Sequence, residues 1–375
     1  MTLMLTNISL INTSSVQAAE VDNTVTANDS TTKISLENIR DIVIENNLDL
    51  KIKDNELKIA KETRDDAKDA FESKTKPTEA EYTNTNSDGT VVFDSVAYKA
   101  AVTAYDSAKS AYEKAKDAHK TAKTNYDQKV ESAVYDAQNS YLTYLADVST
   151  EKINGDTVNY NDKKAQVYKI QYESGFISKN EYTSKLQGNT SVNDSNKSKD
   201  TKELDRIKLC NLLGISPDEK VTFNTDITVD FQVISKINYE EDLKQMLDNS
   251  LDIKTKSDNA DDLNDEDDDS DSHDYQVDNA AIELKQAINT AETDFKGKYN
   301  DLIASYNSVK SSYDKITQEQ KDFEVTKVQY DYGFISRNAL DNSQITLDKD
   351  SASFIKARND CYLKYLNYIE MKEGY

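Results

Sequence analysis

The side chains best equipped to bind an ion are the carboxylates of residues 261–274, where nine of fourteen residues are acidic. Asp265, Asp267, Asp269 and Asp271 alternate along this run, as the oxygen ligands of a calcium loop do. A calcium loop also carries glycine at its sixth position and glutamate at its twelfth, and this run has neither. We therefore expect a disordered, solvated acidic loop over 261–274, with loose cation binding as the alternative, and no metal site.

The two histidines, His119 and His273, are the other candidates for metal binding or catalysis. Neither belongs to a zinc-ligand spacing or to a Ser-His-Asp arrangement. The sequence also has no glycine-rich phosphate loop and no nucleophile elbow. We therefore predict that the protein is not an enzyme, with no catalytic residues and no cofactor.

The most informative residues belong to a repeated segment. Segment 171–180 (QYESGFISKN) recurs 158 residues later, 329 minus 171, as segment 329–338 (QYDYGFISRN), with seven of ten positions identical. The match continues upstream without a gap, for example at Val167 and Val325. A glycine followed by Phe-Ile predicts a helix break that presents an apolar knob to a partner. In the alternative, Phe and Ile only lock the turn of their own chain.

A second landmark shows that the whole chain is duplicated. Segment 45–51 (ENNLDLK) pairs with segment 248–254 (DNSLDIK) at an offset of 203, 248 minus 45. Each half predicts a short helix, a second helix, a loop, a long helix, a glycine turn and a return helix. The predicted divisions are a first repeat over 34–217, closed by Gly214 and Pro217, a linker over 218–238 and a second repeat over 239–375.

The elements that position the turns are long helices. The first helix is expected over 34–47 with Ser35 as its cap, the next over 48–74, the long helix over 97–172 and a single return helix over 178–213. Alanines alternate in steps of four and three from Ala97 to Ala122, and tyrosines recur every seven residues from Tyr98. This heptad predicts a thin coiled-coil seam with alanine in both positions, along a helix about 110 Å long at roughly 1.5 Å per residue.

Composition and charge agree with an extended, exported protein. Hydrophobic residues make up 37 %, with only 8 glycines and 2 prolines, and the net charge is −23. A sequence with few helix-breaking residues and a low apolar fraction favours long helices over a rounded hydrophobic core. The acidic surface excludes nucleic acid as a partner. Residues 1–19 resemble a secretion signal that lacks the usual Lys/Arg region at its start. A true start codon further upstream would explain why this region is missing. We expect a disordered N-terminal segment over 20–33.

This order of elements, from about Ile34 to the C-terminus, resembles the TolC-like outer membrane efflux proteins. The resemblance is carried by the paired glycine turns, the opening at 45–51 and the closing segment 212–217 (LLGISP). It implies an all-α fold of long antiparallel helical hairpins in two repeats, a homotrimer enclosing a tunnel, and docking to an adaptor protein of an inner-membrane transporter. The resemblance places the adaptor-docking tip at Gly175, Phe176, Ile177, Gly333, Phe334 and Ile335.

The resemblance also implies an acidic residue soon after each turn, at the mouth of the tunnel. Glu181 fits that position in the first repeat. The second repeat has Ala339 there, with Asp341 two residues later. Glu181 is equally well explained as an ordinary exposed helix residue.

The chain departs from the family where membrane strands are expected. Asp88-Gly89 predicts a hairpin turn and residues 90–93 one apolar strand, but the opposing arm is polar, and the second site is the acidic run 261–274. Placing those carboxylates in lipid is too costly, so we expect at most short vestigial β-hairpins and no full membrane barrel. The expected location is the cell envelope, the outer membrane by resemblance, or the cell wall or exterior where no outer membrane exists. The rival functions are an exported structural coiled-coil protein of the cell surface without channel activity, and a helical-hairpin adaptor.

Two cysteines, Cys210 and Cys361, lie in apolar helical stretches near the ends of the two halves. An exported protein can form a disulfide. Buried free thiols are the favoured interpretation, because sequence alone does not give the separation of the two residues.

Overall fold

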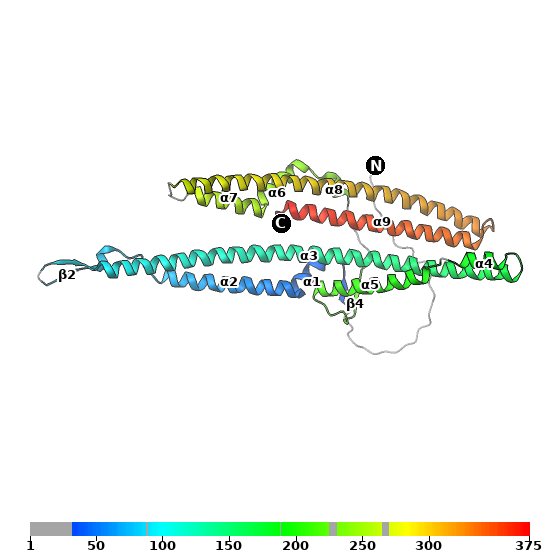
Figure 1. Cartoon of the computed structure of the whole chain (residues 1–375), viewed down its shortest axis with the longest axis horizontal. Helices are drawn as coiled ribbons and strands as arrows, with labels where there is room; N and C mark the ends of the chain where they lie inside the picture. The colour runs from blue at the N-terminus through cyan, green and yellow to red at the C-terminus, as the bar shows by residue number, and fades with distance from the viewer. Residues whose placement is uncertain (1–31, 88, 188, 225–230, 265–269) are drawn as a thin grey trace. The chain divides into compact units, whose positions relative to one another are not determined.

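A computed structural model describes residues 32–87, 89–187, 189–224, 231–264 and 270–375. The predicted secretion signal (1–19), most of the predicted N-terminal segment and residues 265–269 of the acidic run lie outside the described residues. The helices are α1 (Ile39–Asn46), α2 (Leu48–Glu72), α3 (Ser95–Glu173), α4 (Lys179–Leu186), α5 (Ser191–Leu213), α6 (Tyr239–Asn249), α7 (Leu251–Asn264), α8 (Asp271–Asp331) and α9 (Arg337–Lys372) (Figure 1). The strands are β1 (Thr32–Ile34), β2 (Thr83–Thr85), β3 (Val91–Phe93) and β4 (Val221–Phe223), with 3-10 helices η1 (Glu79–Tyr82) and η2 (Phe231–Lys236).

The predicted all-α fold of duplicated helical hairpins is confirmed. The chain divides into two compact units, one made of residues 40–134 with 212–214, the other of 1–39, 135–211 and 215–375. In the described part of the chain, no helix is long and apolar enough to cross a membrane.

In the smaller unit, α2 packs along the N-terminal half of α3. Phe71 of α2 lies against Tyr105 and Tyr112 of α3, with ring centroids 5.3 and 6.0 Å apart. The alanine column that includes Ala115 is at least partly buried, whereas Ala104, Ala111 and Ala118 are exposed. The prediction of alanine in both seam positions was therefore wrong, because the tyrosine rings fill the second position.

The same unit carries the predicted β-hairpin at the far end of α2 and α3. Strands β2 and β3 pair antiparallel, with Thr83 opposite Phe93 and Thr85 opposite Val91. Gly89 in the connecting turn has φ +83°, a conformation that favours glycine. The hairpin arms are three residues each, which agrees with the expected short hairpin.

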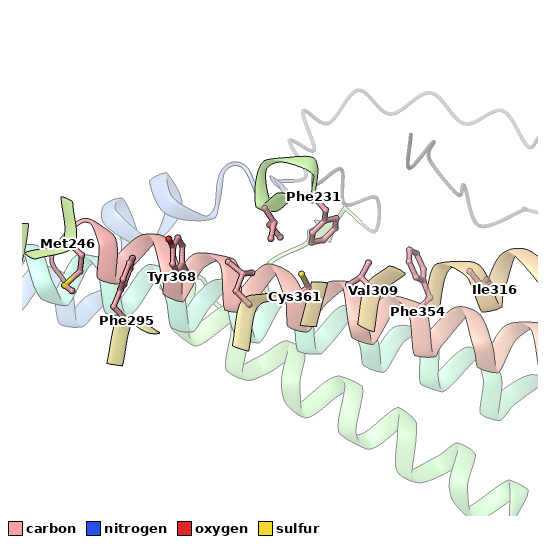
Figure 2. Close-up of a cluster of buried hydrophobic side chains, with 10 residues drawn as sticks. Phe231, Met246, Phe295, Val309, Ile316, Phe354, Cys361 and Tyr368 are labelled. Carbon is pink, nitrogen blue, oxygen red and sulfur yellow. The ribbon is translucent and has the colours of Figure 1, made fainter. Parts of the chain in front are cut away.

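In the larger unit, α8 and α9 form a long antiparallel hairpin, and α7 lies beside the first part of α8 (Figure 1). Figure 2 shows its apolar seam, where Phe295 of α8 stacks on Tyr368 of α9 with ring centroids 4.8 Å apart. The hydroxyl of Tyr368 donates to a carboxylate oxygen of Asp242 at 2.8 Å, which satisfies the polar end of this buried ring. The buried members of the cluster are Phe231, Ile234, Met246, Phe295, Leu302, Val309, Ile316, Phe354, Cys361 and Tyr368.

The return helix of the first repeat is divided into two helices, whereas the return helix of the second repeat is continuous. The predicted single helix over 178–213 is divided into α4 and α5, whereas α9 is one helix of 36 residues. Asn189 accepts from the amide nitrogen and hydroxyl of Ser191 at 3.0 and 2.6 Å. An asparagine side chain that bonds nearby backbone competes with helix formation, which explains the interruption.

Two further predictions about the segments around the repeats need correction. The helix expected from Ile34 begins at Ile39, because Thr32–Ile34 forms β1, which pairs in parallel with Val221–Phe223 of β4. Ser35 is not the helix cap; its backbone N–H donates to the side chain of Asn38 at 2.8 Å. In its described residues, the linker expected over 218–238 contains β4 and η2, and strand pairing fixes it to the start of the first repeat.

Each repeat closes on a glycine that approaches the backbone of its own first helix. Gly214 and Gly374 have φ +68° and +95°. A β-carbon at Gly214 would lie 2.2 Å from the carbonyl oxygen of Asn46, and one at Gly374 would lie 2.3 Å from that of Asn249. Asparagine side chains complete both contacts, since Asn47 donates to the carbonyl of Leu212 at 2.7 Å and Asn249 to that of Lys372 at 3.3 Å.

Both cysteines are free and buried, so the interpretation as free thiols is confirmed. Burial raises the pKa of both thiols, that of Cys361 to about 11. A high thiol pKa suppresses the reactive thiolate, which makes both residues structural members of the helix seams.

Asp147 of α3 and Asp205 of α5 form a carboxyl pair in the first hairpin. Burial, then the hydrogen bond and charge of Asp205, raise the pKa of Asp147 to about 6. The hydrogen bond from Lys208 instead lowers the pKa of Asp205. The pKa of Asp147 is thus higher in the folded chain than its value of 3.8 in the unfolded chain, so the carboxyl keeps its proton to a higher pH.

We predict that Asp147→Asn stabilises the protein at neutral pH. Because the folded pKa is raised, the carboxyl costs stability as pH rises from about 4 to 6, and the cost persists above that window. Asp147 is partly buried, with its Oδ2 covered, and solvent screening of the exposed part limits the effect to about 1 kcal/mol, or about 1–3 °C in melting temperature. Thermal unfolding at pH 7.5 and pH 4 should show the gain only at pH 7.5; an equal shift at both values would contradict it.

Candidate docking surface at the helix turns

The first glycine turn ends α3 with a defined pair of hydrogen bonds. The N–H of Gly175 donates to the carbonyl of Tyr172 at 3.0 Å, and the N–H of Phe176 donates to that of Gln171 at 2.8 Å. These two bonds define a Schellman motif, which needs a left-handed residue at the position of Gly175. Gly175 has φ +77°, so the helix ends at this point because glycine can adopt the left-handed conformation.

The second turn has the same geometry. The N–H of Gly333 donates to Tyr330 at 2.8 Å, and the N–H of Phe334 donates to Gln329 at 2.8 Å, with φ +76° at Gly333. The serine that follows each turn then starts the return helix. Ser178 accepts from the N–H of Glu181 at 3.2 Å, and Ser336 from that of Ala339 at 3.3 Å. The Gly-Phe-Ile-Ser sequence is therefore a stop and a start signal in both repeats.

The two phenylalanines of the turns are the most exposed large apolar side chains of the described residues. Phe176 is 82 % exposed and Phe334 is 79 % exposed. In a Schellman motif this position often packs back on its own helix, and here it does so little. Ile177 and Ile335 are only partly exposed. The rings of both phenylalanines therefore face mainly solvent, although that of Phe334 lies 6.4 Å from the ring of Tyr332.

A second apolar feature near each turn was missed by the sequence reasoning. Val167 and Ile170 of α3 are exposed, and so are their counterparts Val325 and Val328 of α8. A spacing of three residues places each pair on one helix face. The pairs keep the same 158-residue offset as the turns, which is the signal that could have found them. Each tip thus consists of a phenylalanine and a short apolar helix face.

The two acidic residues that follow the turns have different environments. Glu181 is exposed and pairs with Lys185 at 3.5 Å. Asp341 is mostly covered and accepts from Arg337 at 2.7 Å, with Lys163 of α3 at 3.5 Å from its other oxygen. The hydrogen bond that Arg337 donates to Asp341 raises the pKa of Arg337. Asp341 is thus neutralised by two cations, whereas Glu181 faces solvent.

Solved structures share this architecture over nearly the whole chain. The fold is that of the TolC-like outer membrane channels. The CmeC outer membrane channel of Campylobacter jejuni aligns with a TM-score of 0.58 and 12 % identity over 90 % of this chain and 85 % of that one. A membrane protein from Pseudomonas aeruginosa gives 0.56 and 12 % over 96 % of both chains. The outer membrane protein VceC of Vibrio cholerae gives 0.53 and 12 % over 90 % and 96 %.

No family model and no curated protein sequence matches this chain. At 12 % identity, the similarity shows the fold and does not by itself transfer an activity.

Proposed function

We propose that this protein is an export component of the cell envelope, in which three copies form a helical conduit that docks an adaptor–pump assembly and passes cargo outward. The observation that carries the proposal is the pair of matched turns, each exposing a phenylalanine at the end of a long helical hairpin. Each chain exposes two such phenylalanines, so a trimer exposes six in equivalent environments. A ring-shaped partner needs equivalent contact points of this kind.

The chemistry of the tip supports an apolar partner surface. Exposed phenylalanines next to an apolar helix face are typical of protein–protein contacts in which large rings fill pockets. Under this proposal Gly175 and Gly333 fix the turn, Phe176 and Phe334 enter the adaptor, and Ile177 and Ile335 support them from within the chain. Glu181, but not the neutralised Asp341, would place charge at the mouth of the tunnel.

The fold supports a location in the cell envelope, since the similar solved chains include outer membrane channels. Under the proposal the protein acts by enclosing a passage, and needs neither a catalytic group nor a cofactor.

Electron microscopy of the purified protein tests the conduit against the structural rival. A trimeric conduit predicts end-on views with a central hole and three-fold symmetry. A surface coiled-coil protein predicts rods or filaments without end-on rings. Rods alone, in a preparation that is fully folded by circular dichroism, would reject the conduit.

A further inference from the structure

Helix α2 is apolar on two opposite faces. One face, which includes the buried Leu50 and the partly buried Leu57, packs along α3. On the other face Leu48, Ile52 and Ile59 are each more than half exposed. Their spacing of four and seven residues keeps them within about 40° of one another around the helix. We call these three residues the α2 stripe. A helix that is apolar on opposite faces is normally buried on both.

Helix α8 has a second open apolar face near its start. Tyr275 and Ile282 are each more than half exposed, whereas Ala280 and His273 on the opposite side are buried. The spacing of seven residues places Tyr275 and Ile282 on one face. We call this pair the α8 stripe.

Most of the two stripes is not repeated by the duplication, although Leu48 of the α2 stripe has Leu251 as its counterpart. At the offset of 203, Ile52 and Ile59 of the α2 stripe become Thr255 and Asp262 in the second repeat. At the offset of 158, Tyr275 and Ile282 become Asp117 and Thr124 in the first. Beyond Leu48, each stripe therefore occurs once per chain, on a different repeat. Two different single patches are what a head-to-tail ring of copies needs, because each copy then presents one patch to each neighbour.

The two stripes lie at the same height within their repeats. Arg64 of α2 lies beside His119 of α3, with Nη1 and Nδ1 3.3 Å apart. Because α2 runs antiparallel to α3, Ile59, five residues before Arg64, lies level with about residue 124 of α3. The repeat offset carries residue 124 to residue 282, 124 plus 158. Ile59 and Ile282 would thus meet if the repeats of two copies stand side by side in register.

One pair of charges beside the stripes is complementary. Lys51 lies beside the α2 stripe and Asp278 beside the α8 stripe, whereas Lys58 and Glu283 already pair within their own chain, with Asp54 and Lys256. Opposite charges around an apolar strip fix register and disfavour the pairing of like stripes. We propose that the α2 stripe of one copy packs on the α8 stripe of the next copy and so closes the ring. This inference rests on the proposed conduit, and it names the surfaces that join its copies.

Disulfide cross-linking tests this contact in the intact chain. Ile59→Cys with Ile282→Cys, treated with a mild oxidant, should give covalent dimers and trimers on a denaturing gel without reductant. A mixture of the two single variants should stop at dimers, which shows that the bond joins separate chains. The unsubstituted chain is the blank, since Cys210 and Cys361 are buried.

A mismatched pair controls for random collision. Glu324 is exposed on α8 and lies 42 positions beyond Ile282, 324 minus 282, or about 63 Å at roughly 1.5 Å per residue. Ile59→Cys with Glu324→Cys should therefore give at least tenfold less cross-linked product. If the protein assembles but the matched pair links no better than this control, or links only within one chain, the stripe contact is wrong and the conduit stands. A protein that is monomeric throughout would overturn both.

Discussion

Gly214→Ala is expected to destabilise the protein by about 3 kcal/mol or more, whereas Gly175→Ala should cost only about 1 kcal/mol. Both glycines are left-handed, with φ +68° and +77°, so both alanines carry the same backbone strain of about 1–2 kcal/mol. Only at position 214 does the new β-carbon also meet a backbone carbonyl, 2.2 Å away at Asn46. Relief of that overlap needs a backbone shift, which typically costs a further 1–3 kcal/mol.

Urea unfolding followed by circular dichroism measures the difference, because the two variants share the strain and differ in the close approach. The turn at Gly175 has no heavy atom within 4 Å of the added carbon, so it is the matched control. Gly214→Ala should unfold at a clearly lower urea concentration than Gly175→Ala. Equal midpoints would show that the first helix of the repeat does not pack on its closing glycine.

Phe176→Asp combined with Phe334→Asp is expected to abolish adaptor binding and leave the helices folded. Burial of a phenylalanine contributes about 1.5–3 kcal/mol, so each turn should account for about 10- to 100-fold in affinity. Because the rings are 82 % and 79 % exposed, the change in unfolding free energy should stay within about 0.5 kcal/mol. Binding of the purified adaptor to the immobilised protein gives the affinity, and thermal unfolding gives the stability.

Asn180→Asp combined with Asn338→Asp is the control for added charge. These positions lie at the start of the return helices in both repeats, where acidic residues are favourable, and both phenylalanines remain. We expect this control to bind the adaptor nearly as the unsubstituted protein does. Unchanged binding by the phenylalanine variant would remove the tip assignment, while loss in both variants would assign the effect to charge alone.

The sequence was most informative where a local signal has a single structural meaning. The duplication and the glycine stops predicted both turns, because a Schellman motif favours glycine at one position. The serine caps Ser178 and Ser336 were recognised only in the structure. The lengths of α3 and α8 followed from the scarcity of breakers, since neither helix contains proline and each contains a single glycine, Gly155 and Gly297. Gly214 was recognised as a helix end, and the structure adds its contact with Asn46.

Features that depend on distant contacts were not predictable. The pairing of β1 with β4 joins segments almost 190 residues apart, and no local pattern marks such a partner. The use of tyrosine rather than alanine in the seam of α2 and α3 was decided by Phe71, a residue of the other helix. The break between α4 and α5 follows from side-chain bonds of Asn189, which compete with a helix that the apolar pattern alone favoured.

The native mass of the folded protein in solution tests the central claim most directly. Multi-angle light scattering behind a sizing column reports mass independently of shape. Three copies of the 42.3 kDa chain predict a species of about 127 kDa that persists on dilution. A stable species at the mass of one or two chains, in folded material, would contradict a conduit built from three copies.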